Sequence, residues 1–373
     1  MPSPDVLVIG AGIVGAACAR ALAFEGLSVE VLDSRFCGGG STAAAMGHLV
    51  VMDDSEAQFA LTARSRHLWI ELSVDLPPAC EDERTGTLWI AADDEEMTHV
   101  RRKAAFYRER GIEVEPLDGR ALADAEPRLR PGLAGALRVP ADRVLYPVNA
   151  ARFLLEEAQA RGASRREGVG ATSIGPGRVE TAAGSRSAKY IVNAAGVAAP
   201  LLTPGLPIAP RKGHLVITDR YPGFCRHQLV ELGYLKSAHT PSPESVAFNL
   251  QPRATGQMLL GSSREFVGLD AAINRRIRAR MIRRGLEFVP ELSNLSAIRT
   301  WVGFRPATPD NLPLIGRWEA TPDLFVAAGH EGLGVTTALA TGELVADAIL
   351  GRASAIDPSP YSPMRAFPHP AHA

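Results

Sequence analysis

Short apolar runs alternate with amphipathic stretches along most of the chain, which predicts strands alternating with helices. Val6–Ile9 is a fully apolar run of the kind found in buried parallel strands. The stretch 16–25 is rich in Ala and free of Pro, as expected for a helix. Residues 29–32 predict a second strand, which ends at Asp33. Residues 5–33 therefore form one predicted βαβ unit.

The same patterns predict the later elements. Helices are expected near 55–75, 95–110, 150–161, 270–289 and from 334 to about 350, and strands at 87–90, 190–193, 214–217, 245–248, 258–260 and 324–328. In the 270–289 helix, Ile273, Ile277 and Ile282 have the spacing of a buried stripe. Its six arginines indicate either a solvated basic face or a docking face for an acidic partner subunit. The Pro-rich tail, 353–373, is expected to be poorly ordered.

Composition narrows the class of protein. Hydrophobic residues make up 46% of the 373 residues and charged residues 22%, which is typical of a globular protein and excludes a disordered chain. A net charge of −1 gives no drive toward nucleic acid. Four scattered cysteines without a C-x-x-C pair predict neither a metal site nor a disulfide framework. Without a signal peptide or membrane span, we expect a cytoplasmic protein, with contact to the inner membrane through an electron acceptor left open.

A glycine-rich turn joins the first predicted strand and helix. Gly10 permits the tight turn, Gly12 lets the backbone approach a pyrophosphate, and Gly15 lets helix and strand pack closely. The helix N-terminus then offers free N–H groups to phosphates. Asp33, at the end of the second strand, is placed to accept ribose hydroxyls, which disfavours NADP. This combination predicts dinucleotide binding.

Distant segments favour FAD over NAD. A second glycine-rich loop, 39–48, follows Asp33, and Arg305 lies in a G-F-R-P segment. The G-H-E-G-L-G segment, 329–334, opens the last helix, where its N–H groups could stabilise negative charge on a reduced ring. A chain that reaches one cofactor with both its first and last elements suits a long cofactor.

From about residue 5 to 350, these motifs resemble the D-amino-acid oxidase/sarcosine oxidase family of FAD-dependent enzymes. Further shared motifs are V-N-A-A-G at 192–196, and Pro252 and Arg253 with Gly256 and Gly261. The resemblance implies an α/β fold: a discontinuous Rossmann-like FAD-binding domain and a substrate domain on a mixed or antiparallel β-sheet. We place the first at 1–75, 141–205 and 297–352, and the second at 76–140 and 206–296.

The resemblance also implies roles for single residues. Arg305 matches the arginine that binds the substrate carboxylate, and His48 matches a polar position beside the flavin. Asn249 stands where glycine-oxidase-like members place a carboxylate-binding tyrosine, and Tyr234 is a candidate substitute. A packing or structural role is the alternative for each. The expected cofactor-binding residues are Gly10, Ala11, Gly12, Ile13, Val14, Gly15, Asp33, Ser34, Ser41, Thr42, Gly47, His48, Ala171, Ala195, Gly196, Arg305, His330, Glu331, Gly332, Leu333 and Gly334.

Two departures from the family pattern shape the expected chemistry. Gly303 replaces the cysteine that attaches flavin in monomeric sarcosine oxidases, so we expect non-covalent FAD. Leu259 replaces their oxygen-activating lysine, which favours a dehydrogenase over an oxidase. We expect hydride transfer from an amino acid or secondary amine carboxylate to the flavin.

Within the family, the segments 45–50, 86–91 and 329–334 are most similar to bacterial D-hydroxyproline dehydrogenases. Such an enzyme would form the cyclic imine. Two alternatives remain: the β subunit of a heteromeric opine or cyanide-forming glycine dehydrogenase, and an oxygen-using glycine or sarcosine oxidase. The expected partners are a small-molecule substrate, an unidentified electron acceptor, and either a partner subunit or a second copy of the chain, with no nucleic acid.

Overall fold

The computed structural model of the chain describes residues 3–233 and 244–367, so Tyr234 lies outside the described residues. The chain divides into two compact units. The first comprises Met1–Cys80, Tyr146–Arg211 and Phe304–Ala373, and the second comprises Glu81–Leu145 and Lys212–Gly303. The domain boundaries after residues 75, 140, 205 and 296 stay a prediction; the compact units change after residues 80, 145, 211 and 303.

The first unit is built on a six-stranded sheet in the order β18-β19-β12-β1-β2-β8. All neighbouring strands are parallel except β18 and β19, which are antiparallel. Because side chains alternate along a strand, Leu7 and Ile9 of β1 share one face, where they pack with Val179 and Ile191. The strands are β1 (Val6–Ile9), β2 (Val29–Asp33), β8 (Ser164–Glu167), β12 (Tyr190–Asn193), β18 (Leu314–Arg317) and β19 (Leu324–Ala328).

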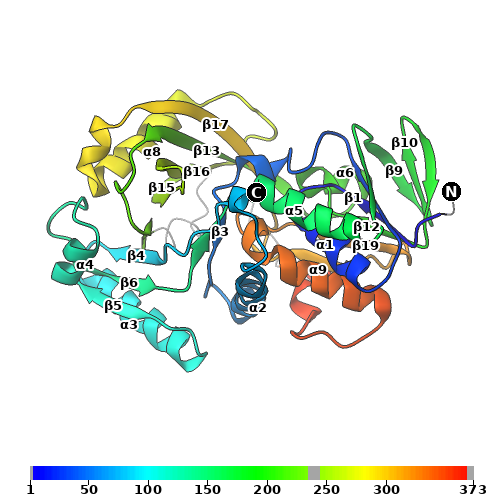
Figure 1. Ribbon diagram of the computed structural model, residues 1–373, viewed down its shortest axis with the longest axis horizontal. Helices are drawn as coiled ribbons and strands as arrows, with labels where there is room; N and C mark the ends of the chain where they lie inside the picture. Colours follow the sequence, from blue (N-terminus) through cyan, green and yellow to red (C-terminus); the bar gives the residue numbers. More distant parts are fainter. Residues whose placement is uncertain (1–2, 234–243, 368–373) are drawn as a thin grey trace. The chain divides into compact units, whose positions relative to one another are not determined.

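Helices of the first unit pack around the predicted first helix. The helix α1 (Ile13–Phe24) lies beside α5 (Pro147–Ala160) and α9 (Gly334–Leu350), and α2 (Glu56–Leu72) packs against α9 (Figure 1). A Cβ built on Gly342 of α9 would lie 2.6 Å from the Ala17 carbonyl oxygen, so the approach of the two helices requires glycine there. Smaller elements are η1 (Ser41–Ala44), β3 (His48–Leu49), η2 (Pro78–Cys80), β9 (Ala171–Gly175), β10 (Arg178–Thr181), β11 (Gly184–Ser187), η3 (Gly196–Ala198), α6 (Ala199–Leu202) and η5 (Ser359–Tyr361).

The second unit is built on an eight-stranded mixed sheet in the order β17-β13-β16-β15-β14-β4-β6-β5. The pair β14 and β4 is parallel, whereas β13–β16, β15–β16, β14–β15, β4–β6 and β5–β6 are antiparallel. Its elements are β4 (Thr87–Ala91), α3 (Asp94–Glu109), β5 (Glu115–Asp118), α4 (Gly119–Ala125), β6 (Gly135–Val139), β7 (Arg143–Val144), β13 (Ala209–Arg220), β14 (Gln228–Glu231), β15 (Glu244–Pro252), β16 (Gln257–Glu265), α8 (Arg275–Phe288), η4 (Pro290–Asn294) and β17 (Ala297–Ala307).

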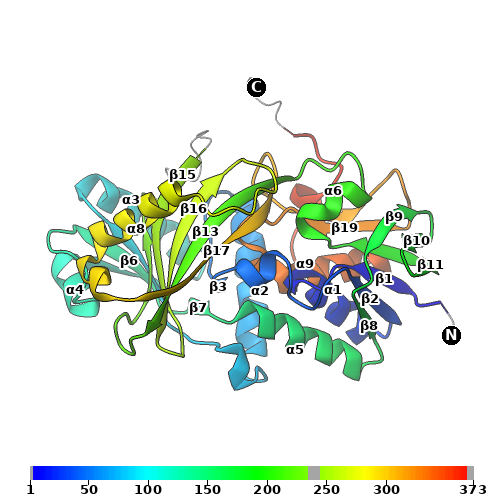
Figure 2. The same cartoon turned by 90° about the horizontal axis from the view of Figure 1, so that it is seen from above.

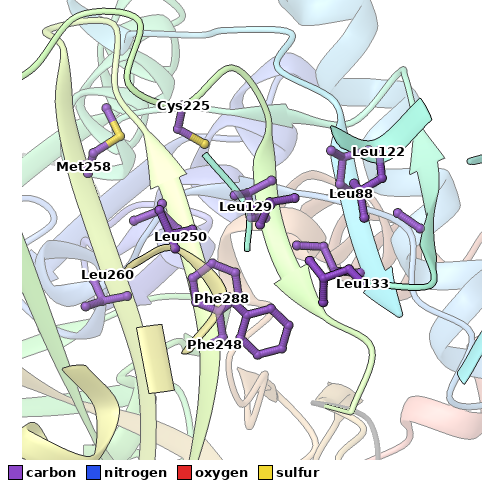
Figure 3. Packing of buried hydrophobic residues seen from close by; sticks show 14 of the residues in the cluster. Leu88, Leu122, Leu129, Leu133, Cys225, Phe248, Leu250, Met258, Leu260 and Phe288 are labelled. Carbon is purple, nitrogen blue, oxygen red and sulfur yellow. The ribbon is translucent and has the colours of Figure 1, made fainter. Parts of the chain in front are cut away.

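The core of the second unit lies between its sheet and the helix α8, which covers β15 and β16 (Figure 2). Phe248 of β15 and Phe288 of α8 stack with ring centroids 4.7 Å apart, and Leu88, Leu250 and Leu260 belong to the same buried cluster (Figure 3). The α/β fold with a mixed second sheet, predicted from the sequence, is confirmed.

Two expectations about the 270–289 helix are wrong, namely its start and the burial of Ile273. The helix predicted from 270 begins at Arg275, because Asn274 caps it by accepting the Arg276 and Ile277 N–H groups. Ile273 therefore precedes the helix and is 39% exposed, whereas Ile277 is buried as expected.

The tail was expected to be poorly ordered, but its described part packs on the first unit. The Tyr361 ring is buried, and its hydroxyl donates to the Ala57 carbonyl oxygen at 2.6 Å. Arg365 forms two hydrogen bonds with the Asp310 carboxylate. These tertiary contacts hold a segment whose composition alone indicated disorder.

Candidate active site

The first strand-to-helix turn has room only for glycine at two positions. Gly10 has φ +107°, and a Cβ built on it would lie 2.5 Å from the Ala194 carbonyl oxygen. A Cβ on Gly15 would lie 1.9 Å from the Gly10 carbonyl oxygen. Real Cβ atoms do not approach so closely, so glycine at these positions lets the strand β1, the start of α1 and the backbone of Ala194 and Ala195 pack together.

The N-terminus of α1 lies at this turn. Gly12 is the N-cap in an extended conformation, and the first turn of the helix contains no acidic side chain. The hydroxyl of Thr42, from the second glycine-rich loop, accepts the Ile13 N–H at 3.0 Å. The Thr42 O–H proton is thereby directed away from Ile13 and can be donated to a phosphate oxygen. A helix N-terminus with an added hydroxyl donor is suited to a pyrophosphate.

Asp33 lies beside the same turn. Its Oδ2 accepts the Ala11 N–H and its Oδ1 accepts the Arg35 N–H, each at 2.7 Å. A carboxylate has about four acceptor positions, so it keeps capacity for two ribose hydroxyls. Gly170 packs against Ser34, with a built Cβ 3.0 Å from the Ser34 Cβ, and this brings the start of β9 at Ala171 next to Asp33. These residues fit the adenosine half of a dinucleotide.

The 329–334 loop, which precedes α9, reaches the same turn. A Cβ built on Gly334, at the start of α9, would lie 3.8 Å from Cγ2 of Val14 in α1. The hydroxyl of Thr336, in the first turn of α9, donates to the His48 carbonyl oxygen at 2.7 Å. The structure therefore brings together the first glycine-rich turn, the His48 segment and the 329–334 loop, as the sequence predicted for one long cofactor.

Arg305 lies against this loop. The Glu331 N–H donates to the Pro306 carbonyl oxygen at 3.0 Å, and a Cβ built on Gly332 would lie 3.5 Å from Nε of Arg305. The hydroxyl of Ser41 donates to the Phe304 carbonyl oxygen at 2.6 Å. The Ser41 hydroxyl, expected to contact cofactor, thus directs its proton to the strand that carries Arg305.

Two of the N–H groups expected to stabilise a reduced ring are used within the loop. The Gly332 N–H donates to the Glu331 carboxylate, and the Leu333 N–H donates to the His330 carbonyl oxygen. Glu331 itself has φ +46°, a conformation uncommon outside glycine. Since N–H groups in the first turn of a helix lack intrahelical acceptors, the donors that this region offers begin at Gly334.

His330 is a buried, neutral side chain. Burial lowers the pKa of His330 to about 3. Its Nε2 lies 3.0 Å from the Thr341 hydroxyl, which itself donates to the Thr337 carbonyl oxygen at 2.9 Å. The hydroxyl therefore accepts from Nε2–H, which fixes the tautomer. His330 ties the loop to α9 and carries no positive charge at neutral pH.

The remaining substrate-side predictions fall on the second unit. Asn249 lies on β15, and its side chain is 6% exposed. Leu259, in place of the lysine, is buried on β16 opposite Gln251.

Sequence reasoning overlooked Arg211, whose Nη1 lies 3.5 Å from Oε1 of Glu331. Both side chains are largely buried. The only signal was an isolated basic pair, Arg211 and Lys212, at the start of a strand. Nothing in that pattern connects Arg211 with a loop far away in the sequence.

No group of three or more metal-ligating side chains gathers anywhere within residues 3–233 and 244–367. Within the same ranges, the helices are too short or too polar to cross a membrane.

Known proteins share this architecture. The family model described as FAD dependent oxidoreductase (DAO) matches residues 5–348. Hydrogen cyanide synthase subunit HcnC of Pseudomonas aeruginosa is 27% identical, with 98% of this chain and 97% of that protein covered. Glycine oxidase of Geobacillus kaustophilus is also 27% identical, with 96% of each chain covered.

Solved structures of similar proteins have the same fold. The crystal structure of glycine oxidase from Geobacillus kaustophilus has a TM-score of 0.89 at 26% identity, covering 99% of this chain and all of that one. L-proline dehydrogenase from P. horikoshii has a TM-score of 0.88 at 27% identity, covering 98% of each chain. The chain belongs to the DAO family of FAD-dependent oxidoreductases, and it is an enzyme that binds FAD and oxidises amino acids or amines.

Proposed function

We propose that the protein is a dehydrogenase for an amino acid with a primary or secondary amine, and that D-hydroxyproline is its substrate, oxidised to the cyclic imine. The observation that carries this proposal is the position of Arg305 against the 329–334 loop, beside the converging starts of α1 and α9. When bound, FAD supplies a two-electron acceptor for the hydride from the substrate Cα.

The side chains of the first unit orient the substrate. The planar guanidinium of Arg305 binds a carboxylate through two parallel hydrogen bonds, which fixes both position and orientation. A fixed carboxylate aligns the Cα–H bond for transfer. His48, held to α9 through its carbonyl group, is proposed to shape the pocket or to accept the ammonium proton. By resemblance alone, Asn249 is proposed as a further substrate-binding residue, with Tyr234 as its candidate substitute.

Two positions favour a dehydrogenase with non-covalent FAD. Gly303 cannot form a thioether with a flavin ring. Leu259 supplies no positive charge, so a reduced flavin would gain little help in passing electrons to oxygen. Electrons would then pass to an electron acceptor other than oxygen, which is unidentified.

The curated relatives support two other candidates. HcnC is named as a subunit of hydrogen cyanide synthase, which favours a glycine-oxidising or opine-oxidising β subunit with a partner. The basic face of α8 is a candidate contact for that partner, although Arg276 and Arg280 already pair with Glu244. Glycine oxidase, named in a second relative, favours an oxygen-using enzyme instead.

Anaerobic visible spectroscopy of the purified holoenzyme separates these candidates. We expect cis-4-hydroxy-D-proline to bleach the flavin band at about 450 nm, since hydride transfer reduces the ring. The band should return slowly in air and quickly with a dye acceptor. Fast return in air would favour the oxidase. Bleaching by glycine or an opine but not by hydroxyproline would replace the proposed substrate.

A further inference from the structure

The 329–334 loop of the first unit holds an acidic residue in an uncommon backbone conformation. Glu331 has φ +46°, in the left-handed region that glycine favours. A residue with a side chain keeps this conformation only where the surrounding contacts hold it. The Glu331 N–H donates to the Pro306 carbonyl oxygen at 3.0 Å, and the Glu331 Oε2 accepts the Gly332 N–H. The carboxylate therefore takes part in the fold of its own loop.

A buried arginine faces the other oxygen of the same carboxylate. Nη1 of Arg211, which also belongs to the first unit, lies 3.5 Å from Oε1 of Glu331. The two side chains are only 8% and 11% exposed. Charges shielded from water in this way are screened much less than surface charges. Arg211 therefore fixes the direction in which the Glu331 carboxylate points.

A second arginine lies beside this loop. A Cβ built on Gly332 would lie 3.5 Å from Nε of Arg305. Consecutive Cα atoms are about 3.8 Å apart, so the long side chain of Glu331, one residue earlier, has the reach to meet the Arg305 guanidinium. A guanidinium binds any carboxylate through the same pair of N–H groups. The direction of the Glu331 side chain thus decides whether the protein's own carboxylate competes with that of a ligand.

The charged and titratable neighbours of the pair in the chain have their own contacts. Burial lowers the pKa of His330 to about 3, so this residue carries no charge at neutral pH. Lys212, which follows Arg211, pairs its ammonium with the Asp270 carboxylate at 2.9 Å. Removal of the Arg211 charge would therefore leave Arg305 as the cation beside the loop to which Glu331 can turn.

We propose that Arg211 and Glu331 are positioning residues for carboxylate binding. Arg211 holds the Glu331 carboxylate away from the Arg305 guanidinium, so the substrate carboxylate meets no competitor from the loop. This inference rests on the proposed function in taking Arg305 as the residue that binds the substrate carboxylate. It predicts opposite roles for the two members of one ion pair: the Arg211 charge favours carboxylate binding, whereas the Glu331 charge opposes it.

Binding of an unreactive carboxylate to the holoenzyme tests this asymmetry. The probe is pyrrole-2-carboxylate, a planar analogue of proline without a Cα–H to transfer, and perturbation of the flavin band gives its dissociation constant. Arg211→Met should raise this constant at least about tenfold, because a buried carboxylate that loses its cation turns to another. Glu331→Gln keeps an oxygen for the Gly332 N–H and should bind as tightly as wild type or more tightly. The double variant should return to the wild-type value, as should Arg211→Lys.

The matched control is Arg253→Met in the second unit. Arg253 pairs with Glu81 at 2.7 Å, their side chains are 11% and 18% exposed, and Glu81 also has a positive φ, +48°. This variant should lower the unfolding temperature without changing the binding of pyrrole-2-carboxylate. Pyrrole-2-carboxamide, which has no charge, should bind equally to wild type and Arg211→Met. Flavin absorbance and thermal unfolding show that each variant retains FAD and folds.

Equal weakening in Arg211→Met and Glu331→Gln would overturn the inference, because the pair would then only stabilise the loop. Unchanged binding in Arg211→Met would overturn it too. If Arg211→Met does not fold, Glu331→Gln still decides, since weaker binding in that variant contradicts the inference.

Failure of the proposed function gives different results. Equal binding of pyrrole-2-carboxylate to wild type and Arg305→Met, or to neither, would show that Arg305 does not bind carboxylates, and both proposals would fall. If hydroxyproline does not reduce the flavin but Arg211→Met and Glu331→Gln differ as predicted, only the proposed substrate is wrong. If Arg305→Met binds weakly and Arg211→Met binds like wild type, only the positioning role is wrong.

Discussion

Nε2 of His330 and the Thr341 hydroxyl lie 3.0 Å apart and join the loop at the start of α9 to the body of that helix. Both residues are buried, and burial lowers the pKa of His330 to about 3, from 6.5. Between these two values the unfolded chain binds a proton at this position and the folded chain does not. The stability contributed by neutral His330 is therefore complete above pH 6.5 and is lost as the pH falls.

His330→Gln should flatten this dependence, because glutamine takes up no proton. We expect the free energy of unfolding of the wild type to fall more steeply between pH 6.5 and 4 than that of the variant. The difference in slope is at most about 1.4 kcal/mol per pH unit. Denaturant titrations at several pH values measure it. The control is His67→Gln, at a side chain that is 59% exposed; equal slopes in wild type and His330→Gln would contradict the prediction.

Gly15→Ala should prevent FAD binding or destabilise the first unit. The new Cβ would lie 1.9 Å from the Gly10 carbonyl oxygen, and overpacking of this kind costs about 1–3 kcal/mol or more. The ratio of flavin to protein absorbance and the unfolding temperature measure the effect. Gly175→Ala is the control, since a Cβ there meets nothing within 4 Å. Full FAD content in Gly15→Ala would show that the turn does not hold the cofactor.

Thr42→Val should weaken FAD binding. The substitution keeps the shape but removes the oxygen that accepts the Ile13 N–H, and loss of such a helix cap costs about 1 kcal/mol. We expect the dissociation constant of FAD to rise at least about fivefold, while Thr42→Ser should remain near the wild-type value. Fluorescence titration of the apoprotein measures both. Identical FAD dissociation constants for Thr42→Val and Thr42→Ser would exclude a role for the Thr42 hydroxyl.

Leu259→Lys tests whether the lack of a positive charge at residue 259 makes the reduced flavin react slowly with oxygen. By the family resemblance, residue 259 corresponds to the oxygen-activating lysine of sarcosine oxidases, and a positive charge there is proposed to favour electron transfer to oxygen. Reoxidation in air should therefore accelerate by at least about tenfold. Leu259→Met controls for the change in side-chain shape. Stopped-flow absorbance after anaerobic reduction gives the rate. A wild type that already reoxidises as fast as the lysine variant would instead be an oxidase.

The sequence predicted those parts of the site that lie within one short stretch of chain. The turn between Gly10 and Gly15 and the acid at Asp33 belong to one βαβ unit, whose spacing reflects strand and helix lengths. The ends of elements were harder to predict, as Asn274 shows, because a side-chain cap can start a helix later than its hydrophobic pattern does.

Tertiary contacts account for what the sequence could not predict. The packing of Tyr361 and Arg365 depends on residues far away in the chain. The same holds for the use of the Gly332 N–H by the Glu331 carboxylate, which depends on an uncommon backbone conformation. The family resemblance identified Asn249, but only the assembled sheet shows that its amide oxygen has no hydrogen-bond partner among residues 3–233 and 244–367.

Arg305 is proposed to bind the carboxylate of an amino acid that reduces bound FAD. The most direct test of this role is an anaerobic titration of wild type and Arg305→Met with hydroxyproline. The titration is followed at the flavin band at about 450 nm. We predict bleaching of both proteins, with the variant requiring at least about 100-fold more substrate, since charge-assisted hydrogen bonds contribute about 1.5–3 kcal/mol each. Bleaching of both at the same concentration would contradict the role of Arg305. If no amino acid bleaches the flavin band of the wild-type protein, the proposed amino-acid dehydrogenase activity is contradicted.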